Sequence, residues 1–139
     1  MKQYQESLEV RTHGRGFVEI TDAVHKAVRA AEIETGQVVV FCRHTSCSLL
    51  IQENADPSAR HDMERWLEKI APENDPAYTH TDEGPDDMPS HLRSLVTKTS
   101  ETIPVVAGRA ALGTWQGLYL AEHRARPHTR RLVLHVTGS

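Results

Sequence analysis

A short apolar run at residues 38–42 limits most strongly the folds that this chain can adopt. It reads Val38-Val39-Val40-Phe41-Cys42, and three of its five residues are β-branched. Runs of this length and composition are typical of buried strands. We therefore expect a sheet with residues 38–42 in one of its central strands.

The residues before this run predict a strand and a helix. Hydropathy alternates along residues 3–11, as in a strand, and residues 17–20 extend that strand or pair with it. Apolar residues then recur at helical spacing as far as Ala31. We expect a helix that Asp22 caps and that Gly36 stops.

The residues after the run predict another strand at 48–52, a second helix and a C-terminal group of strands. Asp56 and Pro57 predict the helix start, as an acidic cap and a proline at the first helical position, and Pro72 ends the helix. The expected inner face of this helix consists of Ala59, Met63, Trp66, Leu67 and Ile70. Further expected elements are a short helix from about Pro89 to Val96, capped by Asp87, and strands at 103–106, 112–120 and 132–136.

Consecutive strands joined by short connections favour antiparallel pairing. The predicted fold class is therefore α+β, with a mostly antiparallel sheet, two main helices and one short helix. A chain of 139 residues buries about two-thirds of its unfolded surface. We expect a single compact domain over residues 1–139.

Charge and cysteine content bear on partners and on location. The net charge is -3, whereas surfaces that bind nucleic acid are basic and clustered, so no nucleic-acid partner is expected. The sequence has no apolar signal core and no apolar run of membrane length, so we expect a cytoplasmic protein without a membrane partner. Cys42 and Cys47 lie in one apolar run at a spacing that points them to opposite faces of a strand, so we expect buried thiols and no disulfide.

Polar residues flank the expected strand at 48–52 and form the first candidate site. His44 is a candidate base or metal ligand, and the carboxylates of Glu53 and Asp56 are candidate catalytic groups. The helix start at Asp56 adds a field that favours anions. Alternatively, Asp56 is only a cap and Thr45 and Ser46 only line a turn. The candidate phosphate-binding residues here are Thr45, Ser46, Ser48 and Asn54.

Residues 80–91 hold the densest group of reactive side chains, with two histidines and four carboxylates beside one glycine and two prolines. A metal site needs several ligands that converge within about 2.0–2.3 Å of one ion, and mixed nitrogen and oxygen donors suit zinc or a similar divalent ion. The alternative is a solvated acidic loop, but that interpretation does not account for the two histidines. The spacing matches no standard zinc motif.

Residues 108–123 form the third feature. Gly113 and Gly117 within a strand-like run predict a bulge or a close approach of another backbone or ligand. Trp115 and Gln116 are candidates for a pocket wall, although packing in the core is the favoured interpretation for Trp115 itself.

Together these strings closely resemble one family, in order and in spacing, over essentially the whole chain. That family is the YjbQ-like family, and the Ser90 position, where alanine is common in the family, is a minor departure. The strings are His44-Thr-Ser-Cys-Ser-Leu, Glu53-Asn-Ala-Asp-Pro57, Glu83-Gly-Pro-Asp-Asp-Met-Pro-Ser-His91, Gly108-Arg and Leu112-Gly-Thr-Trp-Gln-Gly-Leu-Tyr119.

The resemblance implies an α+β homotrimer with a divalent metal, zinc or magnesium, and with weak thiamine-phosphate synthase activity. That reaction joins a pyrimidine diphosphate to a thiazole phosphate, and its diphosphate leaving group must be neutralised. The expected metal ligands are His80 and His91, helped by Glu83 or Asp87. Further candidates are the cations Arg109 and Arg124, with His44 or Asp56 positioning a nucleophile or taking a proton.

Three hypotheses follow. The first is a metal-dependent transferase, resembling thiamine-phosphate synthase, that acts on a small phosphorylated substrate. The second is a metal-dependent hydrolase of another small substrate, because histidine ligands suit a zinc ion that activates water, whereas magnesium prefers oxygen ligands. The third is a non-catalytic trimeric module that binds a metabolite.

Overall fold

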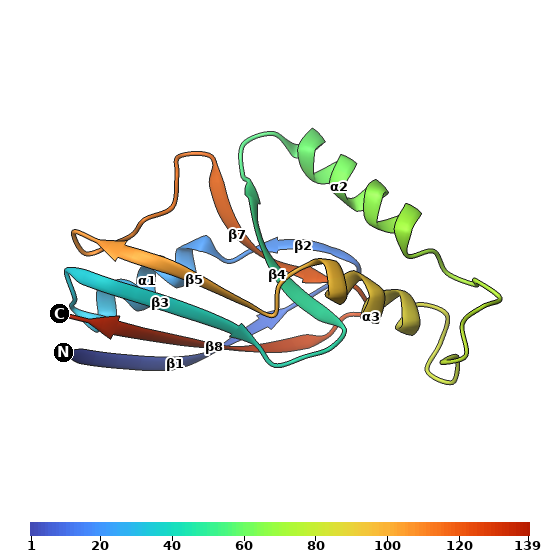
Figure 1. The fold of residues 1–139 in the computed structure, drawn as a ribbon, viewed down its shortest axis with the longest axis horizontal. Coiled ribbons are helices and arrows are strands. Elements are labelled where there is room, and N and C mark those ends of the chain that lie inside the picture. The colour runs from blue at the N-terminus through green and yellow to red at the C-terminus, as the bar shows by residue number, and fades with distance from the viewer.

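The computed structural model describes residues 1–139 as two sheets and three helices (Figure 1). The strand order is β1-β8-β3-β5-β6 in the five-stranded sheet and β2-β7-β4 in the three-stranded sheet. Every strand pairing is antiparallel, which confirms the predicted α+β class. The elements are β1 (Lys2–Arg11), β2 (Gly16–Glu19), α1 (Thr21–Ala31), β3 (Thr35–Cys42), β4 (Cys47–Glu53), α2 (Pro57–Ile70), α3 (Asp87–Val96), β5 (Ser100–Val106), β6 (Arg109–Ala110), β7 (Gln116–Glu122) and β8 (Thr129–Gly138).

One apolar core joins the two sheets and α1. The buried face of α1, which includes Val24 and Val28, packs against strands β1, β6 and β8 of the five-stranded sheet. Leu118 and Leu120 of β7 bring the three-stranded sheet into the same core. Burial of these side chains is the main favourable contribution to folding.

The predicted central strand is β3, which pairs with β8 on one side and with β5 on the other. Val38 and Val40 are fully buried, but Phe41 is exposed. Successive side chains of a strand point to opposite faces, so the expected burial holds for one face of β3 only. The outer face of the five-stranded sheet therefore carries apolar side chains.

The ends of α1 differ from the prediction. Ile20 occupies the N-cap position without a side-chain hydrogen bond, so the predicted cap at Asp22 is wrong. Glu32, in the left-handed conformation, ends the helix, and Gly36 belongs to β3. A Cβ atom at Gly36 would lie 2.0 Å from the Thr137 carbonyl oxygen, so the close approach of β8 requires glycine there.

Two strand predictions also need correction. Residues 17–20 neither extend β1 nor pair with it, because β2 pairs with β7 in the other sheet. Residues 112–115 lie outside any strand, since β7 begins at Gln116. Trp115 is 65% exposed, so the predicted core packing of its ring is wrong.

Helix α2 begins as predicted but packs differently. Asp56 accepts a hydrogen bond from the Ser58 N–H at 2.9 Å, and Pro57 follows it at the start of the helix. Of the predicted inner face only Leu67 is buried, whereas Trp66 is 55% exposed. Figure 1 shows α2 standing away from the strands on the side of β4 and β7. Apart from Leu67, the apolar stripe predicted for α2 is therefore not buried by the rest of this chain.

The two cysteines lie in different sheets, because the chain turns at residues 43–46 between β3 and β4. Their Sγ atoms are 3.4 Å apart, and both are buried free thiols. The expectation that they point to opposite faces of one strand is therefore wrong. None of the three helices combines the length and the hydropathy that crossing a membrane requires.

Candidate metal centre

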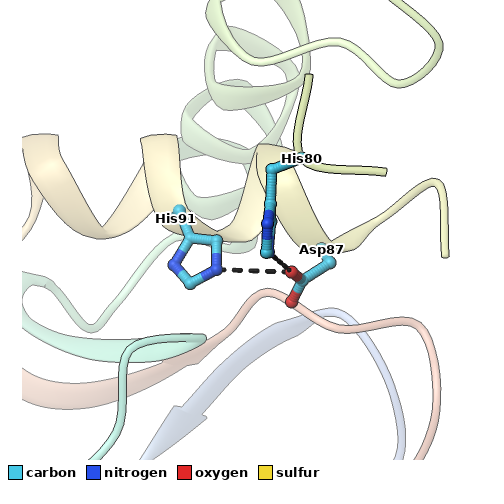
Figure 2. A group of neighbouring side chains, drawn as sticks. All are labelled: His80, Asp87 and His91. Carbon is cyan, nitrogen blue, oxygen red and sulfur yellow. Dashed lines mark hydrogen bonds and ion pairs between the residues drawn. The ribbon is translucent and has the colours of Figure 1, made fainter. Parts of the chain in front are cut away.

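Three of the predicted metal ligands meet at the start of α3 (Figure 2). The Nε2 atom of His80 lies 2.7 Å from Oδ2 of Asp87, and the Nε2 atom of His91 lies 3.3 Å from the same oxygen. One donor atom from each residue lies within 4.8 Å of the other two. Two imidazole nitrogens and one carboxylate oxygen thus converge from a loop and from one helix.

Local structure accounts for this convergence. Asp87 was predicted to cap α3, but it is the first residue of the helix, and Asp86 occupies the N-cap position. His91 follows Asp87 by four positions, so both side chains lie on one face of the helix. His80 comes from the loop before the helix, and its ring meets the His91 ring edge to face, with ring centroids 5.4 Å apart. The two histidines are therefore held side by side above one carboxylate.

Arg124, which follows β7, fixes the carboxylates of this centre. Its Nη1 donates to Oδ1 of Asp87 at 2.6 Å, and its Nε donates to Oδ2 of Asp86 at 3.0 Å. Burial raises the pKa of Asp86, but hydrogen bonds from the Ala125 N–H and from Arg124 outweigh burial and hold that pKa below its usual value. Arg124 thus occupies one oxygen of Asp87 and leaves the other to the histidines, as an outer partner of a metal ligand does.

The centre combines a buried carboxylate with accessible imidazoles. The Asp87 side chain is 4% exposed, whereas the His80 side chain is 50% exposed. Catalytic zinc sites commonly use three protein ligands of this kind and leave a further position open. The donor set therefore fits a divalent ion that a small molecule reaches from the histidine side.

Glu83, the other predicted carboxylate ligand, lies outside this group of donors. Its side chain is exposed, and its backbone carbonyl accepts a hydrogen bond from Nη2 of Arg124 at 2.9 Å. Asp87 occupies the place for which the sequence left Glu83 and Asp87 as alternatives.

The predicted residues His44, Thr45 and Ser46 form the turn between β3 and β4, next to α3. The Ser94 hydroxyl of α3 donates to the Thr45 carbonyl oxygen at 3.0 Å. His44 accepts a hydrogen bond at Nε2 from the Arg131 N–H at 2.8 Å, and burial, with help from Arg130, lowers the pKa of His44. His44 is therefore a neutral imidazole whose Nε2 lone pair is already engaged.

Ser48 is buried within a polar network that the sequence did not reveal. Its hydroxyl lies 2.5 Å from the Thr97 hydroxyl and 2.8 Å from Nε2 of His123. Burial lowers the pKa of His123 to about 3, so this imidazole is neutral. The only sequence signal for His123 was the unusual number of histidines, nine in all.

The remaining predicted residues lie apart from the metal centre, and of these Asn54, Trp115 and Gln116 contact one another. The Asn54 amide donates to the Gln116 carbonyl oxygen at 3.2 Å, and the Asn54 N–H donates to the Trp115 carbonyl oxygen at 3.0 Å. Glu53 pairs with Gln116 at the far end of β4, about 20 Å along the strand from the turn beside α3. Asp56 lies at the start of α2. Arg109 lies in β6, which follows the end of β5 that points away from α3 in Figure 1.

Comparison with known proteins places this architecture. The family model described as "UPF0047 protein YjbQ-like" matches residues 6–139. The UPF0047 protein sll1880 of Synechocystis is 47% identical over 137 residues, which are 99% of this chain and 93% of that protein. The UPF0047 protein YjbQ of Escherichia coli O157:H7 is 40% identical over 97% of this chain and 98% of its own length. An uncharacterized conserved protein of the YjbQ/UPF0047 family from Clostridium acetobutylicum superposes with a TM-score of 0.84 at 33% identity, covering 96% of this chain and 98% of that chain.

Proposed function

Because this chain belongs to the YjbQ-like family UPF0047, we propose that it is a metal-dependent enzyme that acts on a small phosphorylated metabolite. The observation that carries the proposal is the convergence of His80, Asp87 and His91 on one point. A buried carboxylate beneath two accessible imidazoles supports catalysis better than a purely structural ion site, because a closed structural site has four protein ligands.

The residues of the centre divide the work. His80 and His91 would contribute neutral nitrogen donors, and Asp87 would contribute a negative charge. Arg124 would keep Asp87 oriented, and its charge would favour an anionic group nearby. A divalent ion bound there would polarise a phosphate oxygen or a water molecule.

The specific reaction that we propose is of the thiamine-phosphate synthase type. The thiazole nitrogen forms a bond to the methylene carbon of the pyrimidine as the bond between that carbon and the diphosphate oxygen breaks, and diphosphate leaves. Negative charge grows on the leaving diphosphate, so cationic groups near the centre would lower the barrier. Arg124 is the arginine that touches this centre.

Hydrolysis is a second candidate, which the donor set favours. One class of zinc hydrolases uses two histidines and one carboxylate and keeps a position for water. A panel of phosphoesters, lactones and amides would distinguish hydrolysis from transfer. The third candidate, a non-catalytic module, predicts ligand binding without turnover on any of these substrates.

Zinc titration tests the metal centre directly. We expect His91→Ala and Asp87→Asn to weaken zinc binding about a hundredfold or more, because each removes a donor or its charge. His61→Ala, an exposed histidine on α2, is the matched control and should bind zinc like the unchanged protein. Calorimetric titration measures the affinity. If His91→Ala and Asp87→Asn bound zinc as tightly as the unchanged protein, the assignment of these ligands would be refuted.

Turnover with and without metal tests the enzymatic claim. Protein stripped with a chelator should lose activity toward the pyrimidine diphosphate and thiazole phosphate pair, and added zinc or magnesium should restore it. Full turnover after stripping would contradict metal dependence. Tight zinc binding without turnover, both with the pyrimidine diphosphate and thiazole phosphate and with the panel of phosphoesters, lactones and amides, would favour the non-catalytic module.

We also propose that the chain assembles as a homotrimer. Large apolar side chains are exposed on the outer face of β3, on α2 and on α3, where Leu95 is 78% exposed. Exposed apolar patches of this kind support an association surface. Leu95 follows His91 by four positions on α3, so a partner that covers Leu95 would lie next to the metal centre.

A further inference from the structure

A polar cavity of about 230 Å³ lies between α2, α3 and the strands β2 and β7. Two cationic residues, Arg15 and Arg93, line it together with the imidazole of His123. Pockets for drug-sized ligands begin at about 300 Å³, so this cavity suits a small ion or one functional group. Arg93 follows His91 by two positions, which is about 200° around a helix, so the cavity and the metal centre lie on different sides of α3.

Arg93 is buried without a charged partner. It is 2% exposed, and its Nε atom has no hydrogen-bond acceptor. Its Nη2 atom reaches only the Ala71 carbonyl oxygen, at 3.4 Å. Burial, with the nearby charge of Arg15, lowers the pKa of Arg93, and the charges of Glu68 and Glu73 only partly oppose that shift; a guanidinium keeps its proton in any case. A buried charge is costly unless a partner compensates it.

None of the other groups that line the cavity forms an ion pair with Arg93. Glu122 lines the cavity, but Arg130 donates to both of its oxygens, at 2.8 and 2.5 Å, and neutralises it. His123 is neutral because burial lowers its pKa to about 3. Arg15 adds a second guanidinium, which also binds Glu73 at 2.9 Å.

Two further carboxylates, Glu64 and Glu68, line the cavity from α2, and neither forms an ion pair with Arg93. Glu68 is exposed and lies 3.9 Å from Arg65, so water and Arg65 screen its charge. These carboxylates weaken the attraction of the cavity for an anion without removing it. Neutralising Glu68 should therefore tighten anion binding.

We propose that this cavity binds a tetrahedral oxyanion, either inorganic phosphate or the phosphate group of a small ester, through Arg93 and Arg15. Guanidinium groups match the oxygens of phosphate with paired, charge-assisted hydrogen bonds. The anion would supply the charged partner that the guanidinium of Arg93, which lines the cavity, lacks. The site is separate from the metal centre and does not depend on the function proposed for that centre.

Calorimetric titration with inorganic phosphate, at constant ionic strength and with a chelator present, tests the proposal. The protein should bind phosphate, and Arg93→Met should weaken binding by about tenfold or more because charge-assisted hydrogen bonds are lost. In phosphate-free buffer the melting temperature of Arg93→Met should equal or exceed that of the unchanged protein, because removing an unpaired buried charge relieves a cost. Arg15→Gln, at a partly exposed position, should weaken binding more modestly.

Controls make the outcome decisive. Arg29→Met, on the exposed face of α1, and His91→Ala, in the metal centre, should bind phosphate normally, whereas Glu68→Gln should bind it about twofold more tightly. Binding of glycerol phosphate as well as phosphate would assign the ester, and binding of phosphate alone would assign the free ion. Absence of saturable binding, equal affinity in Arg93→Met, loss of binding in His91→Ala, or equally tight binding of acetate would each overturn the proposal.

Discussion

At the scale of single residues, the end of β7 carries a buried polar network. Glu122 is hydrogen-bonded to Arg130 and Thr12, and His123 is hydrogen-bonded to Ser48. Burial raises the pKa of Glu122, but the hydrogen bonds from Arg130 and Thr12 outweigh it and hold the pKa below its usual value. Paired groups of this kind are costly to break one at a time, because each leaves its partner unsatisfied.

His123 makes stability depend on pH. Its pKa is about 3 in the folded chain and about 6.5 when unfolded, so the unfolded state binds the extra proton between these values. The contribution of His123 is therefore complete above about pH 6.5 and is lost as the pH falls toward 3. As the pH falls from 6.5 to 4, the free energy of unfolding should decrease in the unchanged protein. In His123→Gln it should decrease less, and the difference should be on the order of a few kcal/mol.

Urea unfolding at a series of pH values measures this difference. His61→Gln, at an exposed position on α2, is the control and should follow the unchanged protein. Parallel stability curves for His123→Gln and the unchanged protein would contradict the assignment.

At the scale of elements, α2 is the least integrated part of the fold. Arg60 connects it to β7 through a hydrogen bond of 3.1 Å to the Tyr119 hydroxyl, with the guanidinium 4.9 Å from the ring centroid. Leu67 is the one buried residue of α2. A helix of this length depends on tertiary packing for most of its stability, so its own cap gains importance where packing is sparse.

Removing the cap should therefore loosen the start of α2. In Asp56→Ala we expect amide hydrogens of the first turn to exchange about fivefold faster, because the hydrogen bond to the Ser58 N–H is lost. Asp56→Asn keeps a capping oxygen and should exchange much like the unchanged protein. Hydrogen exchange followed by mass spectrometry measures both variants, and equal exchange in Asp56→Ala and Asp56→Asn would show that the cap contributes nothing.

At the scale of the whole molecule, apolar side chains that one chain leaves uncovered suggest assembly. Sedimentation equilibrium should give three times the chain mass of 15.6 kDa. Leu95→Glu should dissociate the assembly because it places a charge in the proposed interface, whereas Lys98→Glu, beyond the end of α3, should not. A stable monomer of the unchanged protein at micromolar concentration would contradict the proposed trimer.

Local patterns in the sequence were sufficient for the parts of the fold that local physics determines. The β-branched run at residues 38–42 predicted a central strand, and the Asp56-Pro57 pair predicted a capped helix start. The short helix that the sequence predicted from about Pro89 to Val96 is α3, although it begins two residues earlier, at Asp87. Such features depend on residues within a few positions of each other.

Contacts between residues distant in the sequence depended on the tertiary structure. Periodicity indicates that a strand has an apolar face, but it does not indicate which sheet that strand joins. The predicted association of residues 17–20 with β1 was therefore wrong, because β2 pairs with β7. The turn at residues 43–46 brought the two thiols together, and the length of β4 separated Glu53 from the histidines. The unpaired burial of Arg93 likewise depends on how α2, α3 and β7 pack, because partners of a buried charge come from other elements. The sequence by itself thus determined most of the elements, whereas packing decided which distant side chains meet.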